Sequence, residues 1–329
     1  MTLYDNHQRP IHYLRLAVTD RCNLRCFYCM PAEGIPYLPK KELLSDEEML
    51  WIVRLLAKMG ISKVRITGGE PFLRRDLMAF LEKLVQIEGI AEWHITTNGV
   101  LTAPHLATLK SWGIGSINLS LDSLDAQRFY NITRRNDFQK VMQTLEQILH
   151  YDIPLKINAV VMSAHNIDDL IPLADLTRDL PIEVRFIEEM PFNGEGIRTD
   201  TPFWTHKHIL AHLQQHFPNL QPIDKTPFGT AEKYQIVGHK GTLGIIAAFS
   251  RTFCGTCNRI RITAQGVLKT CLYDNGVLQL RDIVRAGISE EDFTAKILSS
   301  LGNRPKDGFE AEASRQHQPI SESMSIIGG

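Results

Sequence analysis

The chain has 329 residues, of which 43% are hydrophobic and 22% are charged, and its formal net charge is -1. This composition excludes a fibrous, low-complexity or disordered protein, and the length suits one large α/β domain with an appendage or two ordinary domains. The 36 basic and 37 acidic residues cancel, and no stretch approaches the ~20 apolar residues of a membrane-spanning helix. We therefore expect a cytoplasmic protein with no nucleic-acid or membrane partner, which holds any anionic ligand with local cations.

From Tyr13 to Glu188, short β-branched runs alternate with longer amphipathic stretches, which is typical of βα units and a parallel sheet. The predicted strands are Tyr13–Val18, Lys63–Thr67, Glu92–Thr96, Ser116–Leu121, Leu155–Val161 and Glu183–Glu188. The predicted helices begin near Ser45, Arg75, Pro104, Ala126, Phe138 and Ile167. Ser45 and Glu48 have the spacing of a capping box. Right-handed crossovers would curl these units into an open or closed barrel.

A Gly/Pro/Asn-rich segment from Met190 to Pro202 breaks the alternation, so we predict one domain over residues 1–190 and another over residues 191–329. The second part is predicted to be α+β. Its expected helices lie near Trp204–Gln215, Leu278–Arg285 and Glu290–Leu301, and its expected strands near Lys233–Val237, Leu243–Phe249, Ile260–Thr263 and Val267–Cys271. From about Asn303 the chain is polar, and we expect it to be loosely ordered.

The six cysteines form two triplets, and the first is Cys22, Cys26 and Cys29 on a loop after the first strand. Three thiolates would fill three corners of an iron–sulfur cubane and leave one iron open to a ligand. The alternative is a zinc site, which needs a fourth nitrogen or sulfur ligand such as His12 or His94.

The second triplet is Cys254, Cys257 and Cys271, again without an obvious fourth ligand. Zinc completed by His239 is the alternative to a cluster here. Strand alternation places Arg259 and Arg261 on one face beside this triplet, where two guanidinium groups can clamp phosphate oxygens. The competing interpretation is a solvated strand face.

The first triplet has the spacing C-x₃-C-x₂-C with an aromatic residue before the last cysteine, and Gly68-Gly69-Glu70-Pro71 follows the second strand. Together these features resemble the radical S-adenosylmethionine (SAM) superfamily. The resemblance implies an incomplete (β/α)6 barrel of the TIM type and a [4Fe-4S] cluster whose open iron chelates SAM. The resemblance also implies that reductive cleavage of SAM yields a 5′-deoxyadenosyl radical. The glycines would let the backbone approach SAM, and Glu70 would accept a hydrogen bond from the ammonium group of SAM.

Further motifs narrow the resemblance to the GTP 3′,8-cyclases of molybdenum cofactor biosynthesis. They are Leu14-Arg15-Leu16, Val64-Arg65-Ile66-Thr67, Thr96-Thr97-Asn98-Gly99, Asn118-Leu119-Ser120-Leu121-Asp122, Lys156-Ile157-Asn158, Arg185-Phe186-Ile187-Glu188-Glu189-Met190, the Asn258-Arg259-Ile260-Arg261 run after Cys257, and the Gly328-Gly329 end. In one position the chain differs from the expected pattern, because Arg134 follows Thr133 where a glycine is expected.

This second resemblance implies a role for individual residues. Cys22, Cys26 and Cys29 would hold the SAM-binding cluster, and Cys254, Cys257 and Cys271 a second [4Fe-4S] cluster that meets the guanine. The SAM contacts would be Tyr28, Gly69, Ser120 and Met190. The GTP contacts would be Arg15, Arg65, Thr96, Lys156, Arg259, Ile260 and Arg261, with Arg185, Gly328 and Gly329 near the substrate channel. No side chain is expected to act as an acid or base, because the chemistry takes place on the bound cofactor.

The same resemblance implies the reaction and the partners. The expected product is (8S)-3′,8-cyclo-7,8-dihydroguanosine 5′-triphosphate. The expected partners are GTP, SAM, an electron donor of unspecified identity and, by pathway, the downstream cyclic pyranopterin monophosphate synthase; a homodimer is compatible with the family. Two rivals stay open: another radical SAM enzyme with an auxiliary cluster, such as a peptide maturase, and a zinc-dependent module that binds nucleotides or nucleic acid.

Overall fold

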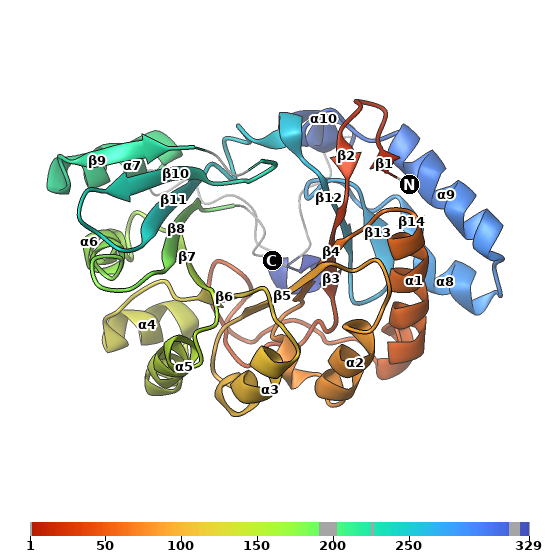
Figure 1. The fold of residues 1–329 in the computed structure, drawn as a ribbon, viewed down its shortest axis with the longest axis horizontal. Coiled ribbons are helices and arrows are strands. Elements are labelled where there is room, and N and C mark those ends of the chain that lie inside the picture. The colour runs from red at the N-terminus through yellow and green to blue at the C-terminus, as the bar shows by residue number, and fades with distance from the viewer. Residues whose placement is uncertain (1, 191–202, 225–226, 316–322, 329) are drawn as a thin grey trace.

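The structure, a computed structural model, describes residues 2–190, 203–224, 227–315 and 323–328. Its centre is a strongly curved sheet whose outer side is covered by helices and whose inner side surrounds the C-terminal end of the chain (Figure 1). Within the described residues, no helix is both long and apolar enough to cross a membrane.

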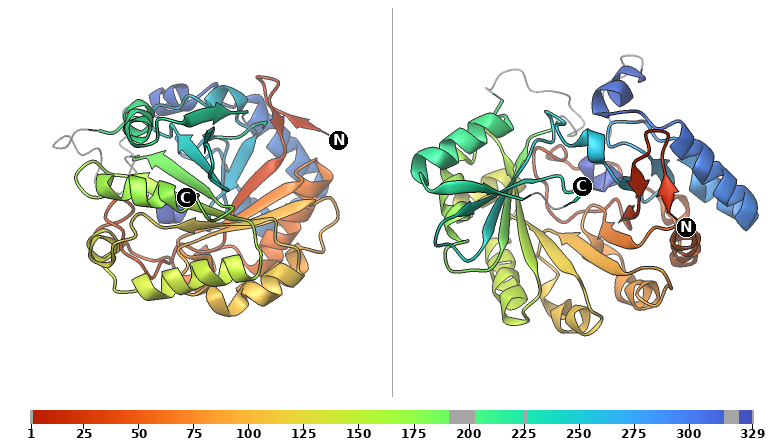
Figure 2. Two further views of the ribbon diagram at one scale, coloured as in Figure 1. Left: turned by 60° about the vertical axis from the view of Figure 1, so that its left-hand side comes forward. Right: turned by 45° about the horizontal axis from the view of Figure 1, so that its top comes forward.

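Six neighbouring parallel strands form the middle of the sheet, and each of the five connections between them contains at least one helix. The strands are β3 (Tyr13–Ala17), β4 (Lys63–Thr67), β5 (Glu92–Thr97), β6 (Ser116–Ser120), β7 (Leu155–Val161) and β8 (Glu183–Glu188). The helices are α1 (Asp46–Lys58), α2 (Leu77–Leu84), α3 (Leu106–Ser111), α4 (Ala126–Thr133), α5 (Phe138–His150) and α6 (Leu170–Asp175). This arrangement confirms the predicted incomplete (β/α)6 barrel, and Figure 2 shows its curvature from two further sides.

Period-two alternation decides which side chains face the helices and which face the interior. In β3, Leu14 and Leu16 are fully buried in the main hydrophobic cluster, whereas Arg15 between them faces the interior cavity. The expected capping box of α1 is also present, because the Ser45 backbone N–H donates to Glu48 Oε2 at 2.8 Å and the Glu48 N–H donates to Ser45 Oγ at 3.2 Å.

The C-terminal part extends this same sheet at both edges. Strand β12 (Arg259–Ile262) pairs in parallel with β3, and β11 (Thr242–Ile246) pairs in parallel with β8. Beyond them lie β13 (Val267–Lys269), β14 (Leu278–Gln279), β10 (Glu232–Ile236) and β9 (Leu220–Ile223), in the order β14-β13-β12-β3-β4-β5-β6-β7-β8-β11-β10-β9. The sheet therefore runs across the proposed boundary at Met190, and the division into residues 1–190 and 191–329 stays a prediction.

The remaining elements lie around this sheet. They are the hairpin of β1 (Leu3–Tyr4) and β2 (Pro10–Ile11), the helices α7 (His206–His216), α8 (Leu280–Arg285), α9 (Glu290–Gly302), α10 (Gly308–Ala313) and α11 (Met324–Ile327), and the 3-10 turns η1 (Lys40–Glu42), η2 (Pro71–Leu73), η3 (Ala103–His105), η4 (Ile167–Asp169) and η5 (Cys254–Thr256).

The expectation of loose order after about Asn303 is wrong for the described residues. Helix α10 follows, and Ala311 and Ile327 are buried. Ser323 caps α11 and donates through Oγ to the carbonyl oxygen of Cys29 at 2.6 Å. The polar residues that suggested disorder are used as helix caps and as donors to the first cysteine loop.

Arg134 adopts the conformation for which a glycine is expected. Its φ of 55° places it in the left-handed region at the C-terminus of α4. The side chain compensates for the strained backbone, since Arg134 Nη1 donates to the carbonyl oxygens of Met30 at 3.2 Å and Arg25 at 3.4 Å. The substitution thus ties α4 to the loop that carries the first cysteine triplet.

Glu188 connects the end of β8 to the C-terminal part of the chain. Its carboxylate is fully buried and accepts hydrogen bonds from the His206 N–H at 2.6 Å, the Phe249 N–H at 2.9 Å and the Ser250 N–H at 2.7 Å. Ser250 Oγ donates to it as well, at 2.8 Å. One charged group thereby satisfies donors from the start of α7 and from the loop after β11.

We expect Glu188→Gln to lower the free energy of unfolding by about 2–3 kcal/mol, because an amide NH₂ would face these N–H donors. Chemical denaturation followed by circular dichroism measures the change. Glu82→Gln on the exposed side of α2 is the matched control, with a change within about 0.5 kcal/mol. Equal losses in both variants would contradict this role for Glu188.

Candidate functional site

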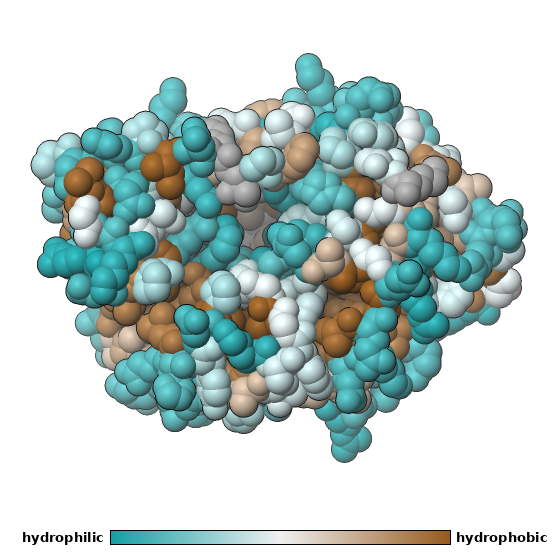
Figure 3. Space-filling view, in the orientation of Figure 1, coloured by the Kyte–Doolittle hydropathy of each residue, from teal (hydrophilic) through white to brown (hydrophobic). Residues whose placement is uncertain are grey.

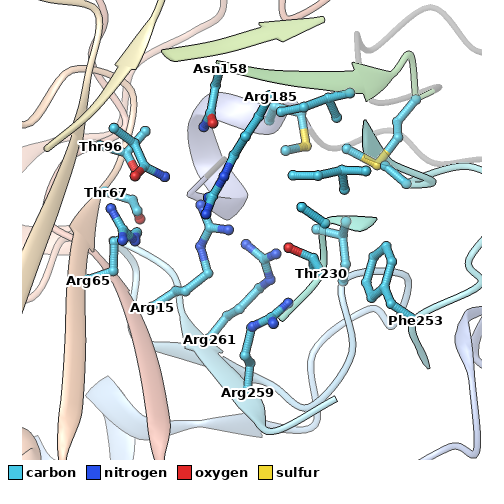
Figure 4. Close-up of a pocket in the computed structure, with 18 of the residues that line it drawn as sticks. Arg15, Arg65, Thr67, Thr96, Asn158, Arg185, Thr230, Phe253, Arg259 and Arg261 are labelled. Carbon is cyan, nitrogen blue, oxygen red and sulfur yellow. The ribbon is translucent and has the colours of Figure 1, made fainter. Parts of the chain in front are cut away.

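A cavity of about 470 Å³ lies inside the curved sheet, and all six cysteines line it. Seen in space-filling form, this face of the molecule is hollowed near its middle, and hydrophilic residues border the opening (Figure 3). Arginine, threonine and asparagine side chains from the strands point into this cavity (Figure 4). Both triplets therefore face a single chamber that these polar side chains also line.

The first triplet lies on the loop after β3, and the β4 and β5 loops hold that loop in place. A Cβ added at Gly69 would lie 2.2 Å from the Arg21 carbonyl oxygen, and one added at Gly68 would lie 2.5 Å from that of Thr19. The Asn98 amide lies 3.8 Å from Cys22 Sγ and is held by Asn23. The two glycines thus allow the β4 loop to contact the cysteine loop directly.

Glu70 is not among the residues that line the cavity, and the expectation that it meets the ammonium group of SAM stays a prediction. Its carboxylate is fully buried and accepts from Thr97 Oγ1 at 2.8 Å, from the Asn98 N–H at 2.7 Å and from the Phe72 N–H at 3.2 Å. Burial raises the pKa of Glu70 to about 7. Its role is to join the loops that follow β4 and β5.

Burial disfavours the thiolate in the first triplet when no metal is bound. It raises the pKa of Cys22 to about 12 and that of Cys29 to about 11, and the pKa of Cys26 is raised well above its ordinary value. A thiol releases its proton to solvent when it becomes a metal ligand, and iron would supply the positive charge that stabilises the thiolate here.

In the second triplet, Cys254 lies in η5, Cys257 directly follows η5, and Cys271 lies shortly after the end of β13. Burial raises the pKa of Cys271 to about 11 and also raises the pKa of Cys254. Cys257 differs: burial raises its pKa, but the guanidinium groups of Arg304 and Arg259 outweigh that effect and lower it. Arg304 Nη2 lies 3.1 Å from Cys257 Sγ.

Among the residues that the structure describes, no three His, Cys, Asp or Glu side chains converge on the position of one metal ion. A closed zinc site places its ligands at about 2.0–2.3 Å from one ion, whereas a cubane takes one thiolate at each of several irons.

Three arginines stand side by side across the inner wall. Strand register aligns Arg261 of β12 with Arg15 of β3, and Arg15 with Arg65 of β4. Within the described chain, Arg65 and Arg261 form no ion pair with a carboxylate: Arg65 donates to Tyr13 Oη at 2.7 Å and Arg261 to the Gly328 carbonyl oxygen at 2.8 Å. Like charges in neighbouring strand positions repel each other.

The pKa values reflect this crowding of positive charge. Burial and the Arg261 guanidinium lower the pKa of Arg15 far below its ordinary value, and burial together with Arg259 lowers that of Arg261 to about 10. Burial opposes the ionisation of Tyr13, but Arg65, Arg15 and Arg259 outweigh it and lower its pKa to about 7. The wall is built to receive an anion with several charges.

A second group of cations lies on β7, β8 and β10 around a buried carboxylate. Glu183 pairs with Arg185 at 2.6 Å, with Lys156 at 3.2 Å and with Lys233 at 3.7 Å. Burial and the Arg185 charge lower the pKa of Lys156 to about 8. Three cations around one carboxylate leave a net positive charge at this side of the cavity.

Five side-chain oxygen atoms of cavity-lining residues are buried and have no hydrogen-bond partner among the described residues. They are Thr67 Oγ1, Thr96 Oγ1, Asn118 Oδ1, Asn158 Oδ1 and Asn258 Oδ1. Buried polar atoms are rarely left unsatisfied, so they mark positions where a polar ligand or water binds.

Nearly all of the residues expected to bind SAM or GTP line this cavity. For SAM they are Tyr28, Gly69, Ser120 and Met190, and for GTP they are Arg15, Arg65, Thr96, Lys156, Arg259 and Arg261, together with Arg185. Tyr28 donates to the buried Asp122 carboxylate at 2.8 Å. The structure thus brings together positions that lie far apart in the sequence.

Ile260 and Gly328 are not among the described residues that line this cavity. The Ile260 side chain is fully buried on the opposite face of β12 and does not reach the cavity. Gly328 lies against β3 and β4, where an added Cβ would be 2.4 Å from Thr67 Oγ1 and 3.1 Å from Ala17 Cβ. Gly329 lies outside the described residues.

The sequence interpretation missed several lining residues, chiefly Lys63, Asn118, Asn158, Lys233 and Arg304. For three of them a signal was present, because Asn118, Asn158 and Lys63 occupy inward positions of predicted strands next to chosen residues: Asn118 is aligned with Lys156, and Asn158 with Arg185. Lys233 and Arg304 come from the C-terminal part, whose position against the barrel cannot be inferred from periodicity.

Comparison with family models and curated proteins gives a consistent result. The model described as Radical SAM superfamily matches residues 16–177, and the one described as Molybdenum Cofactor Synthesis C matches residues 182–310. The chain is 39% identical over 329 residues to the GTP 3′,8-cyclase of Desulforamulus reducens, covering 99% of this chain and 100% of that protein. It is 43% identical over 305 residues to Molybdenum cofactor biosynthesis protein 1 of Bos taurus, covering 92% of this chain and 48% of that protein. The chain thus spans about half the length of the curated animal proteins it matches.

Solved structures with the same fold include SuiB of Streptococcus suis. One has a TM-score of 0.61 at 12% identity and covers 96% of this chain and 77% of that chain. Another, bound to S-adenosylmethionine, has a TM-score of 0.58 at 15% identity and covers 83% of this chain and 63% of that chain. At these identities the likeness shows the fold alone.

The cavity should bind inorganic triphosphate less tightly as the pH rises from about 7 to about 9, because Lys156 has a pKa of about 8 and Tyr13 one of about 7. Deprotonation of Lys156 removes a positive charge from the cavity, and deprotonation of Tyr13 adds a negative one. We expect the affinity to fall about tenfold, the value of one hydrogen bond to a charged group. Isothermal titration calorimetry at the two pH values measures it. Lys156→Arg, which stays charged, should lose less, and binding that is equal or tighter at the higher pH would contradict the assignment.

Proposed function

Because the chain belongs to the family of GTP 3′,8-cyclases, we propose that it cyclises GTP to (8S)-3′,8-cyclo-7,8-dihydroguanosine 5′-triphosphate, in the first step of molybdenum cofactor biosynthesis. The observation that carries the proposal is one cavity with three thiols at each of two positions and a row of buried arginines between them. That arrangement suits an anionic nucleotide held between two clusters.

We propose that Cys22, Cys26 and Cys29 hold a [4Fe-4S] cluster with an open iron for SAM, and that Cys254, Cys257 and Cys271 hold a second cluster that meets the guanine. When bound and reduced, the first cluster with SAM supplies the 5′-deoxyadenosyl radical that takes the hydrogen from C3′ of GTP. The chain itself contributes binding, orientation and exclusion of water.

Four residues on the first side of the cavity would position SAM. They are Tyr28, Gly69, Ser120 and Met190. The hydrogen bond from Tyr28 Oη to the Asp122 carboxylate fixes the orientation of the Tyr28 ring. The Gly69 backbone reaches the cavity from β4 because the glycine packs tightly on the cysteine loop.

The cations would hold the triphosphate and fix its distance from both clusters. Arg15, Arg65 and Arg261 form the row across three strands, and Arg259 stands on the same face of β12 as Arg261. Lys156 and Arg185 extend the charge to the other side. Guanidinium groups bind phosphate oxygens in pairs, which fixes orientation as well as position. Thr96, with its unsatisfied hydroxyl, would bind a polar atom of the nucleotide.

The electron donor and the downstream cyclic pyranopterin monophosphate synthase belong to the proposal as partners. A peptide maturase with an auxiliary cluster is the runner-up, because the chain shares its fold with SuiB, of which one solved structure is bound to the precursor peptide SuiA. The cations named above for the triphosphate suit such a ligand and have no evident use in binding a neutral peptide segment. The cation set therefore favours the nucleotide.

The first test separates the two cysteine triplets. Anaerobically reconstituted wild type should contain about eight irons per chain, and either Cys26→Ala or Cys271→Ala should reduce the number to about four. Cys26→Ala should abolish the formation of 5′-deoxyadenosine, because the SAM-binding site is lost. Cys271→Ala should retain some cleavage of SAM and lose the cyclised nucleotide, as measured by mass spectrometry. Formation of 5′-deoxyadenosine by Cys26→Ala, or zinc in place of iron in wild type, would refute the proposal.

The second test concerns the tail. Gly328 has a φ of +81° and lies against Thr67, and its carbonyl oxygen accepts from Arg261. We propose that the tail helps to place Arg261 beside the substrate, so Gly328→Ala or deletion of Gly328 and Gly329 should reduce turnover at least about tenfold with both clusters retained.

Gly287→Ala is the matched control, because Gly287 has a φ of +76° but nothing within 4 Å of the added Cβ. Its backbone strain is similar and its distance from the cavity removes any direct effect. Turnover that is unchanged in the tail variants, or equally reduced in Gly287→Ala, would refute the role of the tail.

A further inference from the structure

Arg304 is a buried cation that none of the roles described above uses. It follows α9, and only 3% of its surface is exposed. Its Nη2 lies 3.1 Å from Cys257 Sγ. We propose that Arg304 is a positioning residue of the second cluster, and that its N–H···S bond raises the reduction potential of that cluster. The inference rests on the proposed function, because it requires a cluster on Cys254, Cys257 and Cys271.

The guanidinium group is held in a single orientation by backbone acceptors. Arg304 Nε donates to the Thr270 carbonyl oxygen at 2.9 Å, Nη1 to that of Cys257 at 3.0 Å, and Nη2 to that of Arg259 at 2.9 Å. These acceptors lie at or next to Cys257 and Cys271. The side chain thus fixes the relative position of the two segments that carry these ligands.

The N-terminal hairpin anchors the opposite side of this guanidinium group. Asp5 Oδ2 accepts from Arg304 Nη1 at 3.0 Å and from Arg9 Nε at 2.6 Å, and the Asp5 side chain is fully buried. Arg9 in turn donates to the carbonyl oxygens of Cys254 at 3.1 Å, Pro305 at 3.0 Å and Lys306 at 2.6 Å. Arg9 and Arg304 therefore share one carboxylate and both hold the cysteine loop, and Arg304 donates to a cysteine sulfur as well.

A charged donor on a cluster sulfur changes the energy of one-electron reduction. The reduced cluster carries one more negative charge, so a hydrogen bond from a cation to its thiolate ligand stabilises the reduced form more than the oxidised one. Burial increases the effect because little water screens it. The first triplet has a weaker counterpart, a neutral amide 3.8 Å from Cys22 Sγ.

The test measures the reduction potentials of both clusters by an anaerobic redox titration with electron paramagnetic resonance, in wild type, Arg304→Met and Arg9→Met. We expect Arg304→Met to make reduction of the second cluster at least tenfold less favourable, a fall of about 59 mV for one electron. The potential of the first cluster should stay unchanged. Arg9→Met removes a neighbouring cation that shares Asp5 and should shift the potential clearly less.

An unchanged potential in iron-loaded Arg304→Met, or an equal shift in Arg9→Met, would overturn the proposal. If Arg304→Met does not retain the second cluster, Arg304→Lys is measured in its place. One ammonium group cannot reach Asp5, three carbonyl groups and a sulfur together. The reduction potential of the second cluster should therefore fall, but less than if the charge were removed. A potential equal to that of wild type, or loss of iron from this variant too, would leave Arg304 a structural role only and overturn the proposal. Wild type with a single cluster would instead refute the proposed function.

Discussion

The pairing of β12 with β3 is the contact on which the cavity depends. It places Arg261 next to Arg15 and brings the segment that contains Cys254 and Cys257 to the open side of the barrel. Without it, the inner wall would lack Arg259 and Arg261. The pairing also has a cost, because it aligns three guanidinium groups in neighbouring strands. A bound polyanion would offset the repulsion between these guanidinium groups, and this relief would add to the affinity for such a ligand.

The two cysteine loops are held by different means. The first is fixed by close backbone contacts at Gly68 and Gly69, by Ser323 from the tail and by Arg134 at the end of α4. The second is fixed by the charged side chains of Arg9 and Arg304. Only at the second loop does a guanidinium group of these supports donate to a cysteine sulfur, which favours negative charge on that thiol.

Local pattern predicts much of this fold, since β4, β7 and β8 begin and end where strand alternation places them. Cysteine spacing and strand-borne arginines likewise identify most of the cavity wall. Sequence pattern does not predict the role of a residue when that role depends on a partner far away in the sequence. Asp5 and Arg304 are separated by nearly the whole chain and meet only in three dimensions. Glu70 has the residue type of a ligand-binding group, but its three donors occupy it. Ser323 and Ser325 look like part of a polar tail, yet both are buried.

The position of β11 and β12 at the two edges of the barrel has a consequence for biosynthesis. Both strands are translated after the six parallel strands, so the edges of β3 and β8 stay unpaired while the ribosome adds the rest of the chain. At typical rates of elongation, roughly 10–50 s pass between the synthesis of β3 and that of β12, its partner on this edge. During that interval the nascent chain exposes strand edges that attract other chains, and the loop that carries Cys254 and Cys257 has not yet been synthesised. Assembly of the proposed second cluster would therefore follow the synthesis of most of the chain, and chaperones that shield open edges can act before it.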